Sequence, residues 1–175
     1  MANFLAPADD YAAVASFCNV KTPGAEFKFA VDSAASEVEQ KCGPVLLTTI
    51  SEPIPARASE HVLRYRAASV ASLVPSIGEA LPPAGLAVSG QRLWRLDGGR
   101  IPVGTVTYTS GWPLEEVPLN LRFAGSLLAR HLWRTQLGNQ RANEGDLAPG
   151  TTAWLWPAQA RELARPFMLA PTVFA

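Results

Sequence analysis

The sequence predicts an α+β protein: a helical bundle of two N-terminal helices and one long C-terminal helix, with a small, mostly antiparallel β-sheet and an extended C-terminal arm. Three observations lead to this fold class. Apolar residues recur at helical spacing before Gly43, and short β-branched runs fill the middle of the chain. A strand, a turn and a helix then follow one another without interruption between Val103 and Trp133, around which the rest of the chain is organised.

The N-terminal part is expected to form two helices. Asp9 or Asp10 can cap a short helix that runs through Phe17, because a carboxylate accepts hydrogen bonds from the free amides of a first helical turn. A second helix is predicted from about Ala25 to a stop at Gly43. Its apolar stripe consists of Phe27, Val31, Ala34 and Val38.

The middle of the chain is expected to form the sheet. Apolar or alternating runs predict strands at 45–50, 61–66, 70–77, 86–88, 91–96 and 103–110. The proline-rich segments Ser51–Ser59 and Leu81–Gly85 predict exposed loops, since proline cannot donate to a strand ladder. Asp97-Gly98-Gly99 predicts a hairpin that leads into the last strand.

The long helix is predicted from Pro118 to about Leu137, with Gly138 as its stop. One of its faces is apolar and consists of Leu121, Ala124, Leu128 and Leu132. Arginines occupy another face, at Arg122, Arg130 and Arg134. The helix is therefore amphipathic, and its polar face is expected to meet solvent or a partner.

Charge is balanced overall but unevenly distributed. The formal net charge is zero, so no global field draws the protein to nucleic acid or to an anionic membrane. The long helix has arginines and no carboxylate, whereas the second helix carries more acids than lysines, among them Glu37 and Glu39. These charges could pair the two helices, pair neighbouring subunits or remain separately solvated.

The C-terminal segment is expected to be a linker and a docking arm, so the predicted boundary divides a domain at 1–138 from an arm at 139–175. A short helix is predicted from Pro157 to Ala164. The arm is too apolar for a solvated terminus, and it either docks on another protein surface or folds back on its own domain. Its candidate anchors for a portal or a neighbouring subunit are Trp154, Trp156, Phe167, Met168 and Phe174.

The sequence contains no motif typical of a catalytic, metal or cofactor site. His61 and His131 lack a serine or cysteine partner at a recognisable spacing, so neither is expected to be a catalytic base. Cys18 and Cys42 are expected to be two buried thiols, with a disulfide as the alternative, and nothing completes a zinc set. The N-terminus does not resemble a signal peptide and no window suits a membrane span, so a soluble protein made in a cytoplasm is expected.

Five sequence features in the same order resemble the head-tail connector, or adaptor, proteins of long-tailed bacteriophages. They are EVEQKCG at 37–43, VTYTSGW at 106–112, Val117-Pro118, HLW at 131–133 and PAQARELARPF at 157–167. The resemblance covers most of the chain. The proline-rich loops and the long hydrophobic tail depart from the shorter members of that family.

The resemblance implies a structural virion protein without enzymatic activity or cofactor. Members assemble as a ring, usually of twelve subunits, under the portal protein, extend the channel for viral double-stranded DNA and join the capsid to a stopper or tail protein. This chain would then be made in the host cytoplasm and reside in the virion neck. Some of Arg122, Arg130 and Arg134 would face the DNA channel, or else pair with Glu37 or Glu39 across a subunit boundary. Alternatives are a stopper or tail-completion protein of the same neck, and a small ligand-binding or hydrolase-like enzyme domain.

Overall fold

The computed structural model describes residues 3–137 and 156–169, which form an α+β fold of two compact units. The β unit is the continuous segment Gly43–Glu116, and the helical unit contains the described residues on either side of it. Within the described chain the helices and strands are α1 (Ala12–Cys18), α2 (Ala25–Cys42), β1 (Thr48–Ile54), β2 (Glu60–Val62), β3 (Ala67–Pro75), β4 (Leu86–Ser89), β5 (Arg92–Arg95), β6 (Gly104–Ser110), α3 (Leu119–Leu132) and α4 (Ala158–Ala164). A π-helical segment, η4 (Trp133–Leu137), continues α3.

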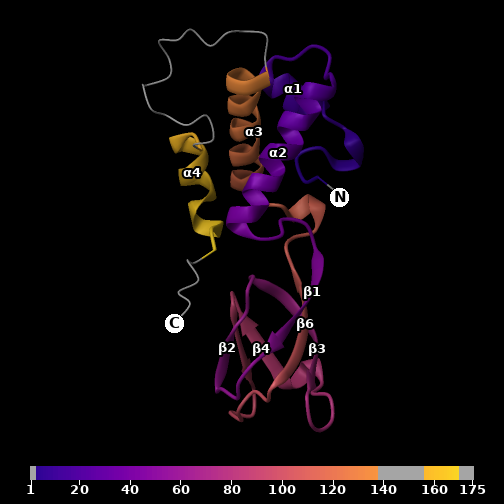
Figure 1. Cartoon of the computed structure of the whole chain (residues 1–175), viewed down its shortest axis with the longest axis vertical. Coiled ribbons are helices and arrows are strands. Elements are labelled where there is room, and N and C mark those ends of the chain that lie inside the picture. Colours follow the sequence, from indigo (N-terminus) through magenta and orange to yellow (C-terminus); the bar gives the residue numbers. More distant parts are fainter. Residues whose placement is uncertain (1–2, 138–155, 170–175) are drawn as a thin grey trace. The chain divides into compact units, whose positions relative to one another are not determined.

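In the helical unit, α3 contacts both α2 and α4 (Figure 1). All four residues of the predicted apolar face of α3 are buried, as are the four predicted stripe residues of α2. The rings of Phe27 and Trp133 meet edge to face, with their centroids 5.4 Å apart. Burial of these two stripes is the main stabilising contribution of the pair, since apolar area removed from water dominates folding.

The N-terminal segment also belongs to this core, which the sequence did not predict. Phe4, Leu5 and Ala6 are all buried. A Cβ atom added at Gly125 of α3 would lie 2.9 Å from the Leu5 side chain, so glycine lets this segment approach the helix closely. The hydroxyl of Tyr11 donates to the Asp32 carboxylate at 3.0 Å and anchors the segment to α2.

The helix predictions agree well with the structure. The predicted helices near Ala25 and Pro157 are confirmed as α2 and α4, and the short first helix is α1. The N-cap residue of α1 is Tyr11 rather than Asp9 or Asp10, and it makes no side-chain cap hydrogen bond. Asp10 lies one residue earlier, and its carboxylate accepts a hydrogen bond from the Ala12 amide at 2.9 Å. The predicted stop at Gly138 lies outside the described residues.

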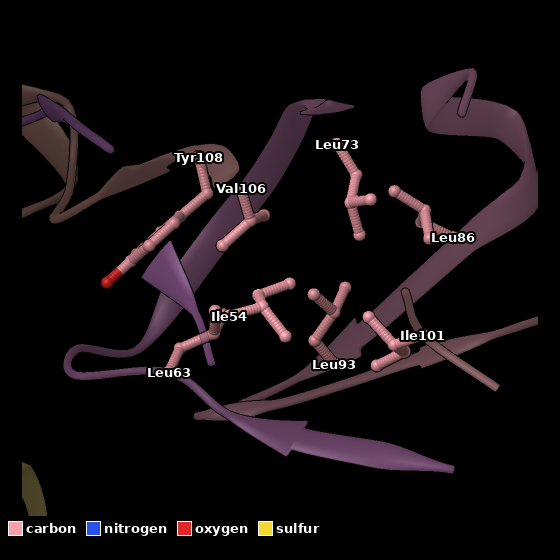
Figure 2. Packing of buried hydrophobic residues seen from close by; sticks show 8 residues of the cluster. All are labelled: Ile54, Leu63, Leu73, Leu86, Leu93, Ile101, Val106 and Tyr108. Atoms are coloured by element: carbon pink, nitrogen blue, oxygen red, sulfur yellow. The ribbon is translucent and has the colours of Figure 1, made fainter. Parts of the chain in front are cut away.

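The β unit contains two antiparallel three-stranded sheets, whereas one small sheet was expected. Their strand orders are β1-β6-β3 and β2-β5-β4. The predicted last strand is confirmed as β6, the central strand of the first sheet. One apolar cluster forms the core of this unit (Figure 2), and it consists of Ile54, Leu63, Leu73, Leu86, Leu93, Ile101, Val106 and Tyr108.

Two predictions about the β unit were wrong, namely a hairpin and the first half of a loop. Asp97-Gly98-Gly99 does not close a hairpin, because the strands on either side, β5 and β6, belong to different sheets. Beyond this turn Ile101 pairs with Ala58, its amide donating to the Ala58 carbonyl at 2.7 Å, and this bridge diverts the chain away from β5.

The predicted loop at Ser51–Ser59 was also wrong in its first half. β1 continues through Pro53 to Ile54, and Ile54 is buried. Proline is tolerated there because β1 is an edge strand that pairs with β6 alone, so no second ladder requires its missing amide hydrogen.

Candidate interaction surfaces

The predicted arginine face of α3 reaches the surface, but its three members differ in their surroundings. Arg134 is exposed, while Arg122 and Arg130 are partly buried. The guanidinium of Arg130 lies over the ring of Phe17 from α1, 5.2 Å from the ring centroid. A cation over an aromatic face is attracted by the ring quadrupole, so this contact holds Arg130 in place without neutralising its charge.

Within the described chain, the charges of Arg130, Arg134 and Glu37 do not pair the two helices. Among the ion pairs of the described residues, none involves Arg130, Arg134 or Glu37. Glu37 is partly buried on α2. The charge of these three side chains therefore remains available to a partner or to solvent.

Three large apolar side chains on the same two helices are exposed. Phe29 of α2 has 62% of its surface exposed, and Leu119 and Phe123 of α3 have 79% and 43%. The ring of Phe123 meets that of Phe17 edge to face with centroids 5.5 Å apart. Their exposure was not predicted from the sequence, although Phe29 falls outside the apolar stripe of α2 and could have been found by that criterion.

The expected docking arm packs on its own helical unit where the structure describes it. Trp156 is buried, and so are Ala160 and Ala164 of α4, which contacts α3. The amide of Leu169 donates to the carbonyl of Lys41 at the end of α2, at 2.9 Å. For residues 156–169 the structure thus follows the fold-back alternative.

Of the other predicted anchors, two are described by the structure and two are not. Phe167 and Met168 are partly buried next to α4. Trp154 and Phe174 lie outside the described residues, as does the predicted domain boundary at residue 138. A role of these side chains in docking, and that boundary, stay predictions.

The two histidines lie in different elements, and His61 belongs to a polar cluster of the β unit. His61 lies 3.5 Å from the Glu52 carboxylate, which also accepts a hydrogen bond from the Tyr108 hydroxyl at 3.0 Å. The Arg64 amide donates to both oxygens of Glu52 at 3.2 Å. This polar cluster joins β1, β2 and β6 and fits a structural role. His131 is partly buried on α3.

Cys18 and Cys42 are both buried free thiols, so the prediction of two thiols is confirmed and the disulfide alternative was wrong. Burial raises the pKa of each thiol to about 11, although Arg130 and Arg134 lower that of Cys18 slightly. At neutral pH both groups are protonated, which suits packing rather than nucleophilic chemistry.

The helical unit has a hollow of about 580 Å³ beside α1, lined by acidic and basic side chains. Lys28 lies over the Tyr11 ring there, 5.3 Å from its centroid, and the hydroxyl of Tyr11 donates a hydrogen bond to Asp32. No group of histidine, cysteine or carboxylate residues with metal-binding geometry occurs among the described residues. The described helices also include none that is long and apolar enough to cross a membrane.

No protein-family model matches the chain, and no curated protein matches it in sequence. Solved structures do share its fold. A chain in the neck of an empty gene transfer agent (GTA) particle, computed with C6 symmetry, matches with a TM-score of 0.62 and 16% identity, over 94% of this chain and 91% of that one. A chain in the neck of a native GTA particle, computed with C12 symmetry, matches with a TM-score of 0.61 and 14% identity, over 94% and 93%.

A third similar chain belongs to the virion of a native gene transfer agent particle. It matches with a TM-score of 0.58 and 16% identity, over 93% of this chain and 91% of that one. At these identities the likeness is one of fold. Because it extends over nearly the whole of each chain, it includes both the helical unit and the β unit.

Proposed function

We propose that this chain is a structural subunit of a virion neck: a head-tail connector, or adaptor, that forms a ring under the portal protein. The observation that carries the proposal is the match of almost the whole chain to neck chains of gene transfer agent particles. The order of sequence features that resembles the adaptor family supports it independently.

In this role the ring would extend the channel for viral double-stranded DNA and join the DNA-filled capsid to a stopper or tail protein. Twelve subunits are the expected number, in keeping with a similar neck computed with C12 symmetry. A neutral monomer suits such a ring, because a channel for moving DNA must not bind phosphates tightly. The protein would be made in the host cytoplasm and act without a cofactor or enzymatic activity.

The experiment is to image the purified full-length chain by negative-stain electron microscopy and to measure its mass in native mass spectrometry, alone and with the portal protein of the same particle. Rings of twelve copies that bind the portal directly support the adaptor role. Binding only to a preformed adaptor ring would instead indicate a stopper or tail-completion protein. A chain that stays monomeric under every condition, including with portal present, would contradict the proposal.

The C-terminal anchors need a finer test than removal of the whole segment. Deleting residues 151–175 would remove Trp156 and α4, which are part of the helical core, so loss of docking could reflect loss of folding. Deleting only 170–175 removes Phe174 and leaves α4 and the Leu169 hydrogen bond in place.

We expect the 170–175 deletion to keep its melting temperature and to bind the portal at least tenfold more weakly, since buried aromatic anchors dominate interface energies. Trp154→Ala is the matched single-residue variant outside α4. Unchanged portal binding by both variants would argue against an arm that docks through these side chains.

A further inference from the structure

We infer that neighbouring copies of this chain join head to tail, the outer face of α2 in one copy packing on the outer face of α3 in the next. The inference rests on the proposed ring and names the two surfaces that build it. The α2 outer face consists of Glu26, Phe29, Ser33, Ser36, Glu37 and Gln40. The α3 outer face consists of Leu119, Phe123, Ser126, Arg130 and Arg134.

The α2 outer face lies opposite the buried stripe of its helix. Phe27 and Val31 are completely buried, whereas Phe29, two residues from each, is 62% exposed. Residues two apart do not share a helix face, so Phe29 points away from the core. Ser36 and Gln40, which follow it at helical spacing, are also exposed.

The α3 outer face has the same relation to its own helix. Leu121 and Leu128 are buried, while Leu119 and Phe123 at the neighbouring positions are exposed. Phe123 and Arg130 both contact the ring of Phe17, which gives this face a fixed aromatic and cationic surface. A rigid face loses little conformational entropy when it binds.

The two outer faces are different surfaces, because each lies away from the buried stripe of its own helix. The helical unit therefore presents two different apolar patches, and Phe17 of α1 borders the patch on α3. A ring closed by rotation needs two different complementary patches, whereas a two-fold dimer needs one patch that matches itself. The distribution of the exposed residues thus fits a ring.

Charge complementarity favours a second copy of this chain as the occupant. Glu26 and Glu37 lie on the α2 outer face, and Arg130 and Arg134 lie on the α3 outer face. None of these four takes part in an ion pair of the described residues. Patches of opposite sign attract one another and exclude pairing of a patch with itself, which sets the head-to-tail direction.

The test mixes two variants, each blocked on one face. Phe29→Asp should abolish ring formation through the α2 outer face, and Leu119→Asp through the α3 outer face, so each variant alone should be a monomer of 18.7 kDa in native mass spectrometry. Mixed in equal amounts, they retain one intact pair of faces, since the first keeps its α3 face and the second its α2 face. The expected product is a one-to-one heterodimer that grows no further.

Ile77→Asp is the matched control, because Ile77 is 93% exposed in the β unit and belongs to neither face. This variant should form rings like the unchanged protein. If either aspartate variant has an altered circular dichroism spectrum or melting temperature, the mixing is repeated with Glu26→Lys/Glu37→Lys and Arg134→Glu, which change only surface charge. Each charge variant alone should be a monomer, and because the two altered faces also attract each other, their mixture should assemble beyond the heterodimer.

The outcomes separate the inference from the proposed function. If the unchanged protein forms no ring, the proposed function itself fails. If it forms rings and the folded variants of both faces do so too, the two outer faces are not the interface. If the variants are monomers and their mixture contains no heterodimer, the two faces do not meet each other and the inference is wrong.

Discussion

Tyr108 shows at the level of one residue how the β unit stabilises a buried polar group. The side chain is completely buried, and its hydroxyl donates to Glu52 and accepts from the Tyr65 amide at 3.3 Å. Burial is the main cause of a raised pKa for this phenol, with the Glu52 charge adding to it. The hydroxyl therefore stays protonated at neutral pH and keeps donating to Glu52.

Tyr108→Phe should lower the free energy of unfolding by about 1–3 kcal/mol, because Glu52 loses a donor and the Tyr65 amide loses its acceptor in a buried place. Urea unfolding of the isolated variant measures this directly. Tyr65→Phe is the control, since it removes a hydroxyl from a partly buried ring that has no hydrogen bond to the described residues. A larger loss for Tyr65→Phe than for Tyr108→Phe would contradict the assigned network.

The two thiols make stability depend on alkaline pH. Burial raises the pKa of Cys18 and Cys42 from 9.0 to about 11, so the folded state retains protons that the unfolded state releases. The stabilising effect is fully present below pH 9 and is lost as the pH rises towards 11. We expect the urea concentration at the midpoint of unfolding to decrease from pH 8.5 to about 9.5, roughly the start of this pH range.

A Cys18→Ala/Cys42→Ala variant should be less stable at pH 7.5 but should lose less of its remaining stability over the same pH range. The measurements are made at pH 8.5 and about 9.5. The buried tyrosines, whose pKa values are also raised, contribute to the loss of stability mainly at higher pH. Equal losses in the variant and the unchanged protein would show that the thiols are not the cause.

At the level of elements, Gly111 allows β6 to end beside the start of the β unit. Its φ is 96°, and an added Cβ would collide with the backbone of Leu46. Directly beyond it, the Trp112 amide donates to the Val45 carbonyl at 2.9 Å and the Leu47 amide donates to the Trp112 carbonyl at 3.1 Å. Only glycine meets both the conformational and the steric requirement.

Gly111→Ala should therefore destabilise the protein more than an alanine at another glycine with positive φ. Gly98 has a φ of 71° and open space around its Cα, so Gly98→Ala should cost only the conformational strain, about 1–2 kcal/mol. We expect at least about twice that cost for Gly111→Ala, measured by thermal unfolding. Equal losses would mean that the Leu46 backbone moves aside easily.

The sequence predicted the helices better than the sheets, for a physical reason. The stripe of α2 and the stop after Cys42 are local patterns, and the structure follows them closely. The pairing of β1 and β3 with β6 is set by contacts between distant segments, which local alternation does not encode. The hairpin wrongly predicted at Asp97 shows this, since the turn forms but the strand after it pairs in the other sheet.

The candidate surfaces were predicted in part. Periodicity identified the arginine face of α3, but it gave no prediction for Phe29 and Leu119. Their exposure became visible only when the packing of α2 on α3 was known. The fold-back of Trp156 was left open because an apolar segment is equally well buried by its own chain or by a partner.

At the level of the whole molecule, the β unit is a continuous segment with its own core, while the helical unit is assembled from separate parts of the chain. Expressed alone, Gly43–Glu116 should fold into its two sheets. We expect only marginal stability, a few kcal/mol, because a segment of this size buries a modest fraction of its surface.

Hydrogen-exchange mass spectrometry of that fragment is the measurement. Protection in β3 and β6, which carry the core residues Leu73 and Val106, should match that of the full chain. Rapid exchange throughout the fragment, with normal protection in the full chain, would show that the β unit depends on the helical unit for folding.

The hydrogen bonds between Val45, Leu47 and Trp112 hold the first and last segments of the β unit together. Genetic recombination could replace the segment between Leu47 and Trp112. The two chain connections to the helical unit would stay unchanged, provided that the new segment kept these hydrogen bonds. The helices of the proposed ring and the inserted sheets could then diverge at different rates. The simplest test of such a replacement is a reporter peptide inserted at Gly78, which lies in open space in the loop after β3.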